Sequence, residues 1–331
     1  MADVAGLAGV SPQTVSRVVN ESGYVGRVTR ERVLAAMRDL NYRPNPAARA
    51  LVTGRSNTLG VVSIDTTLFG PASILLGLER AAHSHGYYVS IASLESFAPG
   101  AVLNAVERLE RQNVEGILIN AGQGGVAHDL GHASTSVPLV AVEDDASSSI
   151  PVVAVDQFAG AVAATRLLLE LGHRTAWHIA GPVDWESGRR RLEGWRTTLE
   201  DAGAELPSPL FGDWSPGAGY ELGRRLAADP EVTAIFVAND QMALGVLRAL
   251  HLAGREVPGD VSLVGFDDIP EARYLTPPLT TVRQDFDEVG RRSLLRLLQA
   301  IDPDAEASPR VTVTPELIVR DSTGRAPQVA R

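Results

Sequence analysis

Three polar residues near the amino end, Gln13, Ser16 and Arg17, are of the types that hydrogen-bond to nucleic acids. Gln can form two hydrogen bonds with adenine, Arg can form two with guanine, and Ser can bind a phosphate or a base edge. Val15 and Val18 fall on the opposite face of the same predicted helix, where they can pack against a neighbour. This spacing predicts a helix that presents a polar face to a DNA groove.

The preceding residues predict the element that holds this helix in place. Val4, Leu7 and Ala8 recur at helical spacing, and Gly9 follows where a helix must end and the chain turn. Ser11 can cap the next helix, with Pro12 at its first position, where the missing N–H costs little. Two helices around a tight turn form a helix-turn-helix, although a small helical hairpin with a polar face would have the same pattern.

A third helix can complete a small domain. We expect Thr29 to cap it, and we expect Val33, Met37 and Leu40 to form the apolar stripe that covers the first two helices. The helix should end before Pro44, since the residue before a proline is displaced from the helical region.

Charge is distributed unevenly along the 331 residues. Residues 1–55 contain eight arginines and four acidic residues, whereas the whole chain has a formal net charge of −10 at pH 7. Basic charge gathered at one end favours phosphate binding. The chain has no cysteine, which excludes disulfides, thiolate zinc sites and a cysteine nucleophile. It has neither a signal-peptide pattern nor an apolar run long enough to span a bilayer, so we expect a cytoplasmic protein without a membrane partner.

From about residue 57 onward, strand-like and helix-like segments alternate. Short apolar runs predict strands at residues 59–64, 88–92, 116–119, 139–142, 177–180, 234–238 and 261–266. Helical patterns lie between most of them, at residues 74–85, 102–112, 159–171, 190–202 and 241–253. This alternation predicts parallel sheets covered by helices on both faces, and so many strands favour two linked sheets over one.

Polar residues follow the predicted strands, where ligands of such sheets bind. They are Asp65, Asn120, Glu143, Asp144, Asp156, Asn239, Asp240, Asp267 and Asp268. Short carboxylate and amide side chains suit the neighbouring hydroxyls of a sugar, and Arg191 could bridge two of them. Flat apolar faces for a sugar ring could come from Trp185, Trp195, Trp214 and Phe286.

Each of these residues also has an ordinary structural explanation. Asn239 and Asp240 could cap the helix that starts before Met242. The run of three arginines that ends at Arg191 could be a solvated helix face, and Trp195 is expected to be a core residue.

Short segments along the chain carry a resemblance to a known family. Near the amino end they are residues 3–5, 8–11, 14–20 and 40–45, and in the large region they are residues 180–182, 194–195, 212–215, 237–245, 265–268 and 277–286. In sequence and order these segments resemble the LacI/GalR family of bacterial transcription repressors. Family members usually begin a few residues earlier, so we expect the first helix here to lack its usual cap.

The resemblance implies an α/β fold with a small all-α helix-turn-helix headpiece, followed by a two-lobed periplasmic-binding-protein-like core of doubly wound parallel sheets. The implied parts are a DNA-binding headpiece (residues 1–44), a hinge helix and linker (45–56), an effector-binding and dimerisation core (57–323) and a tail (324–331). The N-lobe would take residues 57–155 and 286–313, and the C-lobe would take residues 156–285 and 314–323.

The resemblance also implies two sets of binding residues. Contacts to a pseudo-palindromic operator would come from Ser11, Pro12, Gln13, Thr14, Ser16, Arg17, Asn20, Tyr24, Thr29, Asn45, Ala48 and Leu51, with Leu51 as a wedge in the minor groove. The effector would be held by Leu68, Pro71, Ile74, Asn120, Glu143, Ser187, Arg191, Trp214, Asn239, Asp267, Gln284 and Phe286. The tail has no leucine heptad, which predicts a homodimer without a carboxyl-terminal coiled coil.

The function implied is repression of carbohydrate-utilisation genes, with release from the operator by a sugar effector such as a galactoside or another glycoside. Glu143 departs from the Asp of the lactose-type branch, and its extra methylene changes which hydroxyl the carboxylate can reach. No cofactor, metal or enzymatic activity is expected. The alternatives are a corepressor-dependent regulator of the same family, a transport-type sugar-binding protein and a sugar-processing enzyme with a carboxylate pair.

Overall fold

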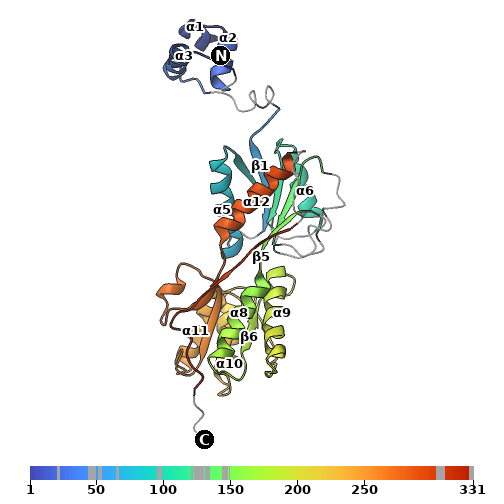
Figure 1. Cartoon of the computed structure of the whole chain (residues 1–331), viewed down its shortest axis with the longest axis vertical. Helices are drawn as coiled ribbons and strands as arrows, with labels where there is room; N and C mark the ends of the chain where they lie inside the picture. Colours follow the sequence, from blue (N-terminus) through green and yellow to red (C-terminus); the bar gives the residue numbers. More distant parts are fainter. Residues whose placement is uncertain are drawn as a thin grey trace. The chain divides into compact units, whose positions relative to one another are not determined.

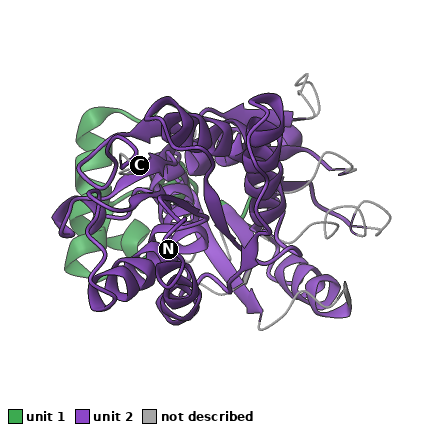
Figure 2. Ribbon diagram, turned by 90° about the horizontal axis from the view of Figure 1, so that it is seen from below, with its two compact units in different colours: residues 1–57 green, residues 58–331 purple. Residues whose placement is uncertain are grey.

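The computed structural model describes residues 1–20, 23–43, 50, 54–64, 67–94, 99–120, 122, 130, 135–143, 148, 150–302 and 310–327, with the side chains of residues 64 and 99 left out. The chain forms two compact units, Met1–Asn57 and Thr58–Arg331 (Figure 2). The hinge candidates Asn45, Ala48 and Leu51 and the strand-end candidates Asp65 and Asp144 lie outside the described residues.

Unit 1 contains three helices, α1 (Ala2–Ala8), α2 (Pro12–Val19) and α3 (Arg27–Asp39). Val4, Val15 and Val33 are buried at their centre, as the apolar spacing predicts. Two apolar assignments were wrong: Leu7 and Leu40 are 56% and 44% exposed and are not part of the buried core, which is formed by smaller side chains.

The start of α3 also differs from the prediction. Gly26 stands at the N-cap and Thr29 lies within the first helical turn, so Thr29 does not cap the helix. Residues 27 and 28 are compatible with helical backbone, and the helix extends back over them. Met1 at the N-cap of α1 gives no side-chain hydrogen bond, as expected for this first helix.

The first lobe of unit 2 is built on a parallel sheet in the order β11-β5-β4-β3-β1-β2. Its strands are β1 (Thr58–Ile64), β2 (Tyr88–Leu94), β3 (Ile117–Asn120), β4 (Leu139–Val142), β5 (Val152–Val155) and β11 (Arg310–Val313). Helices α5 (Phe69–Ser84) and α12 (Phe286–Ile301) pack side by side on one face, and α6 (Pro99–Glu110) covers the other (Figure 1).

The second lobe has a sheet in the order β12-β10-β9-β8-β6-β7, parallel except for the β10–β12 pair. Its strands are β6 (Trp177–Ala180), β7 (Leu210–Phe211), β8 (Ala234–Val237), β9 (Ser262–Asp267), β10 (Thr280–Arg283) and β12 (Glu316–Ile318). Helices α8 (Gln157–Glu170) and α9 (Glu186–Asp201) cover one face, α10 (Pro216–Ala227) and α11 (Asp240–Leu252) cover the other, and a short 3₁₀ helix, η1 (Ala272–Tyr274), precedes β10.

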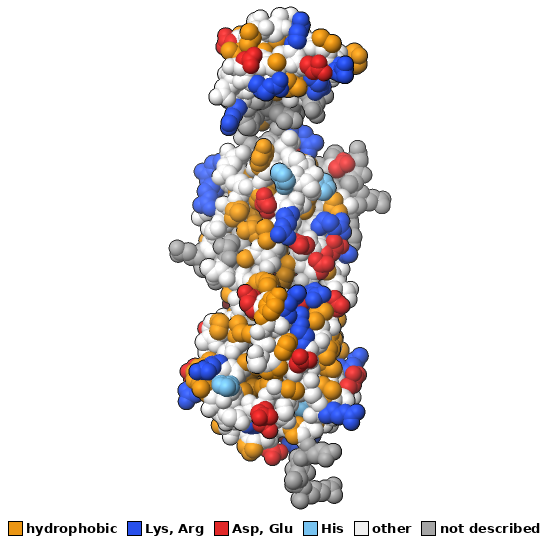
Figure 3. Space-filling view, turned by 90° about the vertical axis from the view of Figure 1, so that its left-hand side faces the viewer, with side chains coloured by type: hydrophobic (Ala, Val, Ile, Leu, Met, Phe, Trp, Pro, Cys, Tyr) orange, Lys and Arg blue, Asp and Glu red, His pale blue; other side chains and the backbone are white. Residues whose placement is uncertain are grey.

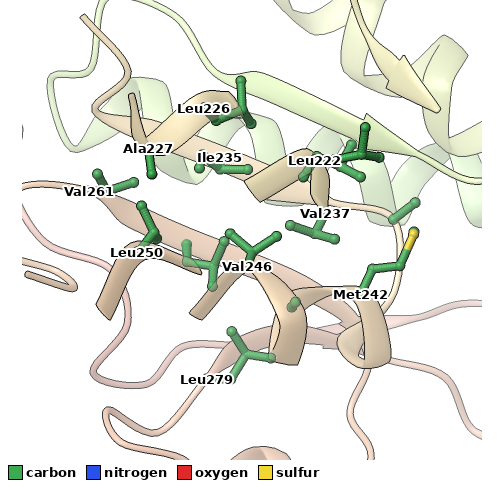
Figure 4. Close-up of a cluster of buried hydrophobic side chains, with 14 of the residues drawn as sticks. Leu222, Leu226, Ala227, Ile235, Val237, Met242, Val246, Leu250, Val261 and Leu279 are labelled. Atoms are coloured by element: carbon green, nitrogen blue, oxygen red, sulfur yellow. The ribbon is translucent and has the colours of Figure 1, made fainter. Parts of the chain in front are cut away.

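The central strands of both sheets are buried on both faces, which explains why they read as continuous apolar runs. Figure 4 shows one of the resulting cores, where Leu222 and Leu226 of α10 and Val246 of α11 meet Ile235 of β8. The pairing of α10 with α11 depends on small residues: a Cβ on Gly219 would lie 2.1 Å from the carbonyl oxygen of Met242.

The chain passes between the lobes after β5, after β10 and between β11 and β12. The carboxyl ends of β3, β4, β8 and β9 all contribute residues to one pocket between the sheets, as expected for doubly wound folds. This architecture confirms the α/β fold with two parallel-sheet lobes and a helical headpiece.

Candidate functional site

In unit 1 the second helix is positioned by its own first turn. Gly9 ends α1 in the left-handed conformation (φ +63°), where a residue with a side chain would be strained. Ser11 caps α2, since its Oγ accepts a hydrogen bond from the Thr14 N–H at 3.2 Å, and Pro12 occupies the first turn. Both features agree with the sequence prediction.

The face of α2 opposite the core carries the groove-reading candidates. Val15 and Val18 are buried, whereas Gln13 and Arg17 are exposed and Ser16 is half-buried. Asn20 Nδ2 donates to Ser16 Oγ at 3.2 Å, which orders both side chains at the end of the helix. Arginine side chains reach the surface of this unit (Figure 3).

The remaining headpiece candidates surround this helix. Ser11 and Pro12 are exposed and Thr14 is half-buried at its amino end, while Tyr24, in the loop before α3, is 94% exposed. Thr29 is half-buried within α3. The arrangement can present hydrogen-bonding side chains to DNA from one helix and its flanking turns.

In unit 2 one pocket lies between the two sheets and opens to solvent. All of the residues predicted to hold the effector line it: Leu68, Pro71, Ile74, Asn120, Glu143 and Phe286 from the first lobe, and Ser187, Arg191, Trp214, Asn239, Asp267 and Gln284 from the second lobe and its crossing. Trp185, predicted as a possible face for a sugar ring, also lines the pocket. The lining further includes residues that were not predicted: Phe69, Gly70, Gly122, Gln157 and Gln241.

Gln157 is the centre of a polar network at the crossings between the lobes. Its amide nitrogen donates to Glu143 Oε2 at 3.0 Å and to Gln284 Oε1 at 2.8 Å, and its oxygen accepts from Arg191 Nε at 2.9 Å. Gln284 in turn donates to Asp267 Oδ1 at 2.6 Å. The network joins Glu143 of the first lobe to Gln157, Arg191, Gln284 and Asp267, which come after the first crossing between the lobes.

Arg191 is buried within this network. It donates to the Ala238 carbonyl oxygen, lies 3.6 Å from Asp267 Oδ1, and stacks its guanidinium 3.8 Å from the centre of the Phe266 ring. Only 4% of Arg191 is exposed. The solvated-face alternative is therefore wrong for Arg191, because the helix turns this one arginine of the run inward.

Burial dominates the protonation of the two pocket carboxylates. Desolvation raises the pKa of Asp267 to about 6, against the opposing effects of Arg191 and the Gln284 hydrogen bond. Desolvation also raises the pKa of Glu143. Hydrogen bonds from the Val155 N–H, 2.6 Å from Glu143 Oε1, and from Gln157 lower this pKa and so oppose the shift. Both groups can accept hydrogen bonds from a ligand in their ionised forms.

Asn239 combines capping with a place in the pocket lining. Its Oδ1 caps α11 by accepting from the Met242 N–H at 3.0 Å, and its Nδ2 donates to the Trp214 carbonyl oxygen at 3.1 Å. The structural explanation of Asn239 is thus correct, and the cap holds the amide at the pocket wall.

Three other strand-end acids do not line the pocket. Asp156 caps α8, Asp240 is fully buried and accepts from Thr281 Oγ1 at 2.6 Å, and Asp268 pairs with Arg283 and Arg320 at 2.7 and 2.6 Å. Each of these three acids binds other groups of the protein, so a place at a strand end does not by itself bring a side chain into the pocket.

Aromatic rings form the rest of the lining. Trp185 and Trp214 meet edge to face at 6.0 Å, and Phe69 and Phe286 do so at 5.7 Å. The Trp214 Nε1–H is buried and has no hydrogen-bond partner within the described part of the chain. Trp195 is a core residue, as expected, and donates to the Ala176 carbonyl oxygen.

Backbone strain is concentrated in the same lining. Glu143, Trp214 and Asp267 have φ values of +59°, +74° and +113°, which L-residues with side chains rarely adopt. Such residues persist where the surrounding structure holds them, and they cluster at ligand sites. Among the described residues, no group of His, Asp and Glu is placed to hold a metal, and no helix is long and apolar enough to cross a membrane.

Comparisons with known proteins find relatives of both units. Residues 1–45 match the model of bacterial regulatory proteins of the lacI family, and residues 165–323 match the periplasmic binding protein-like domain. The chain is 35% identical over 329 residues to the HTH-type transcriptional repressor PurR of Haemophilus influenzae (strain PittEE), with 97% of each chain covered. It is 37% identical over 301 residues to the lactose operon repressor of Escherichia coli (strain K12), with 90% of this chain and 83% of that one covered. The structure of the lac repressor dimer bound to operator and the anti-inducer ONPF matches with a TM-score of 0.90 at 35% identity, covering 97% of this chain and 98% of that one.

Proposed function

Because this chain belongs to the lacI family of bacterial regulatory proteins, whose members are DNA-binding transcriptional repressors controlled by small molecules, we propose that its effector is a sugar bound in the pocket of unit 2. The observation that carries the proposal is the lining itself, which sets buried polar side chains against aromatic rings. Sugars need both, since their hydroxyls form hydrogen bonds and their ring faces are apolar.

The polar part of the lining is suited to neighbouring hydroxyls. Arg191 supplies a fork of donors, and Asp267 and Glu143 supply acceptors whose positions the network holds. The unpartnered Trp214 Nε1–H offers one more donor beside a ring that a sugar can stack on. We propose a galactoside or a related glycoside as the effector.

Glu143 is the residue that we expect to separate this protein's effector from that of lactose-type relatives. Both of its carboxylate oxygens already accept hydrogen bonds from the protein, from Val155 and Gln157. Each oxygen can accept a second bond, so the ligand is offered acceptors with a fixed direction. We propose that this direction selects which hydroxyl is recognised.

The headpiece is proposed to read a pseudo-palindromic operator through Gln13, Ser16 and Arg17 of α2. The exposure of Gln13 and Arg17 supports this role, and we propose that Asn20 and Tyr24 contact or order the DNA backbone. Asn45, Ala48 and Leu51 remain predictions for the hinge.

A homodimer fits the two half-sites of such an operator. The relative whose structure matches at a TM-score of 0.90 is a dimer on its operator. In this chain, large apolar residues are exposed on α5 (Leu76), β2 (Tyr88 and Ile91) and α11 (Leu252), where a second copy can cover them.

We propose induction as the direction of control. Effector binding between the lobes would favour a lobe arrangement that holds the headpieces poorly on DNA, and this requires different effector affinities in the two states. The identities of 35% and 37% to the PurR and lactose operon repressors do not decide between induction and corepression. The polar and aromatic lining supports the lactose-type effector chemistry, and hence induction.

The headpiece argues against a transport-type binding protein, because a lacI-type helical unit has no role in solute capture. The relatives are repressors and not enzymes, which opposes a glycosidase. Binding to operator DNA would place the protein in the cytoplasm.

A thermal-shift screen tests the effector class. Methyl β-D-galactoside, other methyl glycosides, ribose and a purine base are added to the full chain at equal concentrations. The account predicts a raised melting temperature with a glycoside, because a ligand that binds the folded state stabilises it. A shift with the purine base alone would contradict the proposed class.

A further inference from the structure

The sheet orders define two sides of the effector pocket. The crossings lie at β5, β10, β11 and β12, and the polar network around Gln157 lies beside them. In the second lobe β10, β9 and β8 separate β12 from β6, and Trp185 follows β6. In the first lobe β5 and β4 separate β11 from β3, and Gly122 follows β3. Trp185 and Gly122 therefore lie on the side of the pocket away from the crossings.

These two residues are in direct contact across the two lobes. The backbone N–H of Glu186 donates to the Gly122 carbonyl oxygen at 2.9 Å. A Cβ placed on Gly122 would lie 2.6 Å from Trp185 Cζ3, so the indole rests directly on this glycine. Real Cβ atoms do not approach other atoms this closely, and only a glycine leaves the indole in its present position.

The position of the Trp185 indole also depends on its own lobe. Its ring meets Trp214 edge to face at 6.0 Å, and both rings line the pocket. The opposite side is occupied by Glu143, Gln157 and Gln284, which are bound to one another. Along these two sides, a ligand that extends beyond one sugar ring must pass Trp185 or displace this network.

We propose that Trp185 closes the pocket against Gly122 and sets the upper size limit of the effector, which is a monosaccharide or a glycoside with a small aglycone. The inference rests on the proposed sugar-binding function for the chemical class of the ligand. The contact itself requires no ligand, so it can be tested separately.

The first test measures acrylamide quenching of tryptophan fluorescence in the full chain without ligand. Gly122→Ala should displace the indole and increase quenching, and the increase should vanish in a Trp185→Phe background. Gly254→Ala is the matched control, since Gly254 also has a positive φ (+71°) but a Cβ there would meet nothing within 4 Å. Equal quenching in Gly122→Ala, Gly254→Ala and wild type would overturn the proposal.

The second test measures size selectivity by calorimetry with methyl β-D-galactoside, phenyl β-D-galactoside and lactose. In the wild type we expect affinity to fall as the aglycone grows. Trp185→Ala and Gly122→Ala should each raise the affinity for lactose relative to the methyl glycoside by tenfold or more. An equal loss of affinity for all three ligands in the variants would overturn the size limit. If the wild type binds none of the three, the sugar proposal is contradicted. The quenching test would still decide whether Trp185 contacts Gly122.

Discussion

Arg191 provides the sharpest test of how the pocket is built. Its guanidinium donates to Gln157 Oε1 at 2.9 Å and to the Ala238 carbonyl oxygen, and it lies 3.6 Å from Asp267. Arg191→Lys keeps the charge, but the single ammonium can replace only part of the planar fork. Hydrogen bonds to charged groups contribute about 1.5–3 kcal/mol each, so the loss of one or two predicts a decrease of about 1.5–6 kcal/mol in unfolding free energy.

The assay is urea unfolding followed by tryptophan fluorescence. All four tryptophans lie in unit 2, so the signal reports the unit that holds the pocket. Arg196→Lys is the matched control, because Arg196 lies on the same helix α9 and is exposed, and its effect should stay below about 0.5 kcal/mol. Equal stabilities of the two variants would refute the network described for Arg191. If the effector is a glycoside, Arg191→Lys should also weaken its binding about tenfold or more, since one such hydrogen bond is lost to the ligand.

Three further predictions follow from the same geometry. The pKa of Asp267 is about 6 in the folded protein, above its unfolded value, so its contribution to stability is full at low pH and is lost as pH rises through 6. Asp267→Asn should reduce the fall in unfolding free energy over this pH range by at most about 3 kcal/mol. If urea titrations between pH 4.5 and 7.5 give the same dependence on pH for the variant and the wild type, the raised pKa of Asp267 is contradicted. Gln157→Leu removes one hydrogen bond each from Glu143, Gln284 and Arg191 and should lower the unfolding free energy by about 2–3 kcal/mol; a neutral effect on the urea midpoint would show that the network is not formed. Arg17→Ala should weaken operator binding by about 5- to 150-fold in fluorescence anisotropy, whereas Arg38→Ala, exposed on α3, should change it less; equal losses would argue against α2 as the reading helix.

Much of the fold could be predicted because the central strands are short, doubly buried apolar runs. The predicted strand at residues 139–142 matches β4, and the predicted strand at residues 177–180 matches β6. Helix α10 was not predicted, since its sequence is rich in glycine and has low intrinsic helix propensity. Gly219 and Gly223 are required by tertiary packing, because a Cβ on either would collide with α11, and local sequence does not contain that information.

The pocket lining was predictable where family motifs coincide with strand ends, as at Asn239 and Asp267. Gln157 was missed although its neighbour Asp156 was named as a strand-end residue, because local sequence does not show which of the two side chains faces the pocket. The Gly122–Trp185 contact was missed for a different reason. It joins the ends of strands in two different sheets, and only the order of strands in space brings them together.

Trp195 and Asp240 were candidates for the sugar site that do not line the pocket. Both are of types that suit a sugar site, and both are fully buried away from the pocket lining. Residue type alone therefore does not identify ligand contacts; the direction of each side chain from its strand or helix decides them.

The central claim is that a sugar in the unit 2 pocket lowers the affinity of the headpieces for DNA. The direct measurement is a fluorescence-anisotropy titration of the full-length protein on an operator selected from a randomised palindromic library, with and without the glycoside that gives the largest thermal shift. We expect saturating glycoside to weaken operator binding tenfold or more. Operator affinity that stays unchanged or rises when the same glycoside is bound would contradict it.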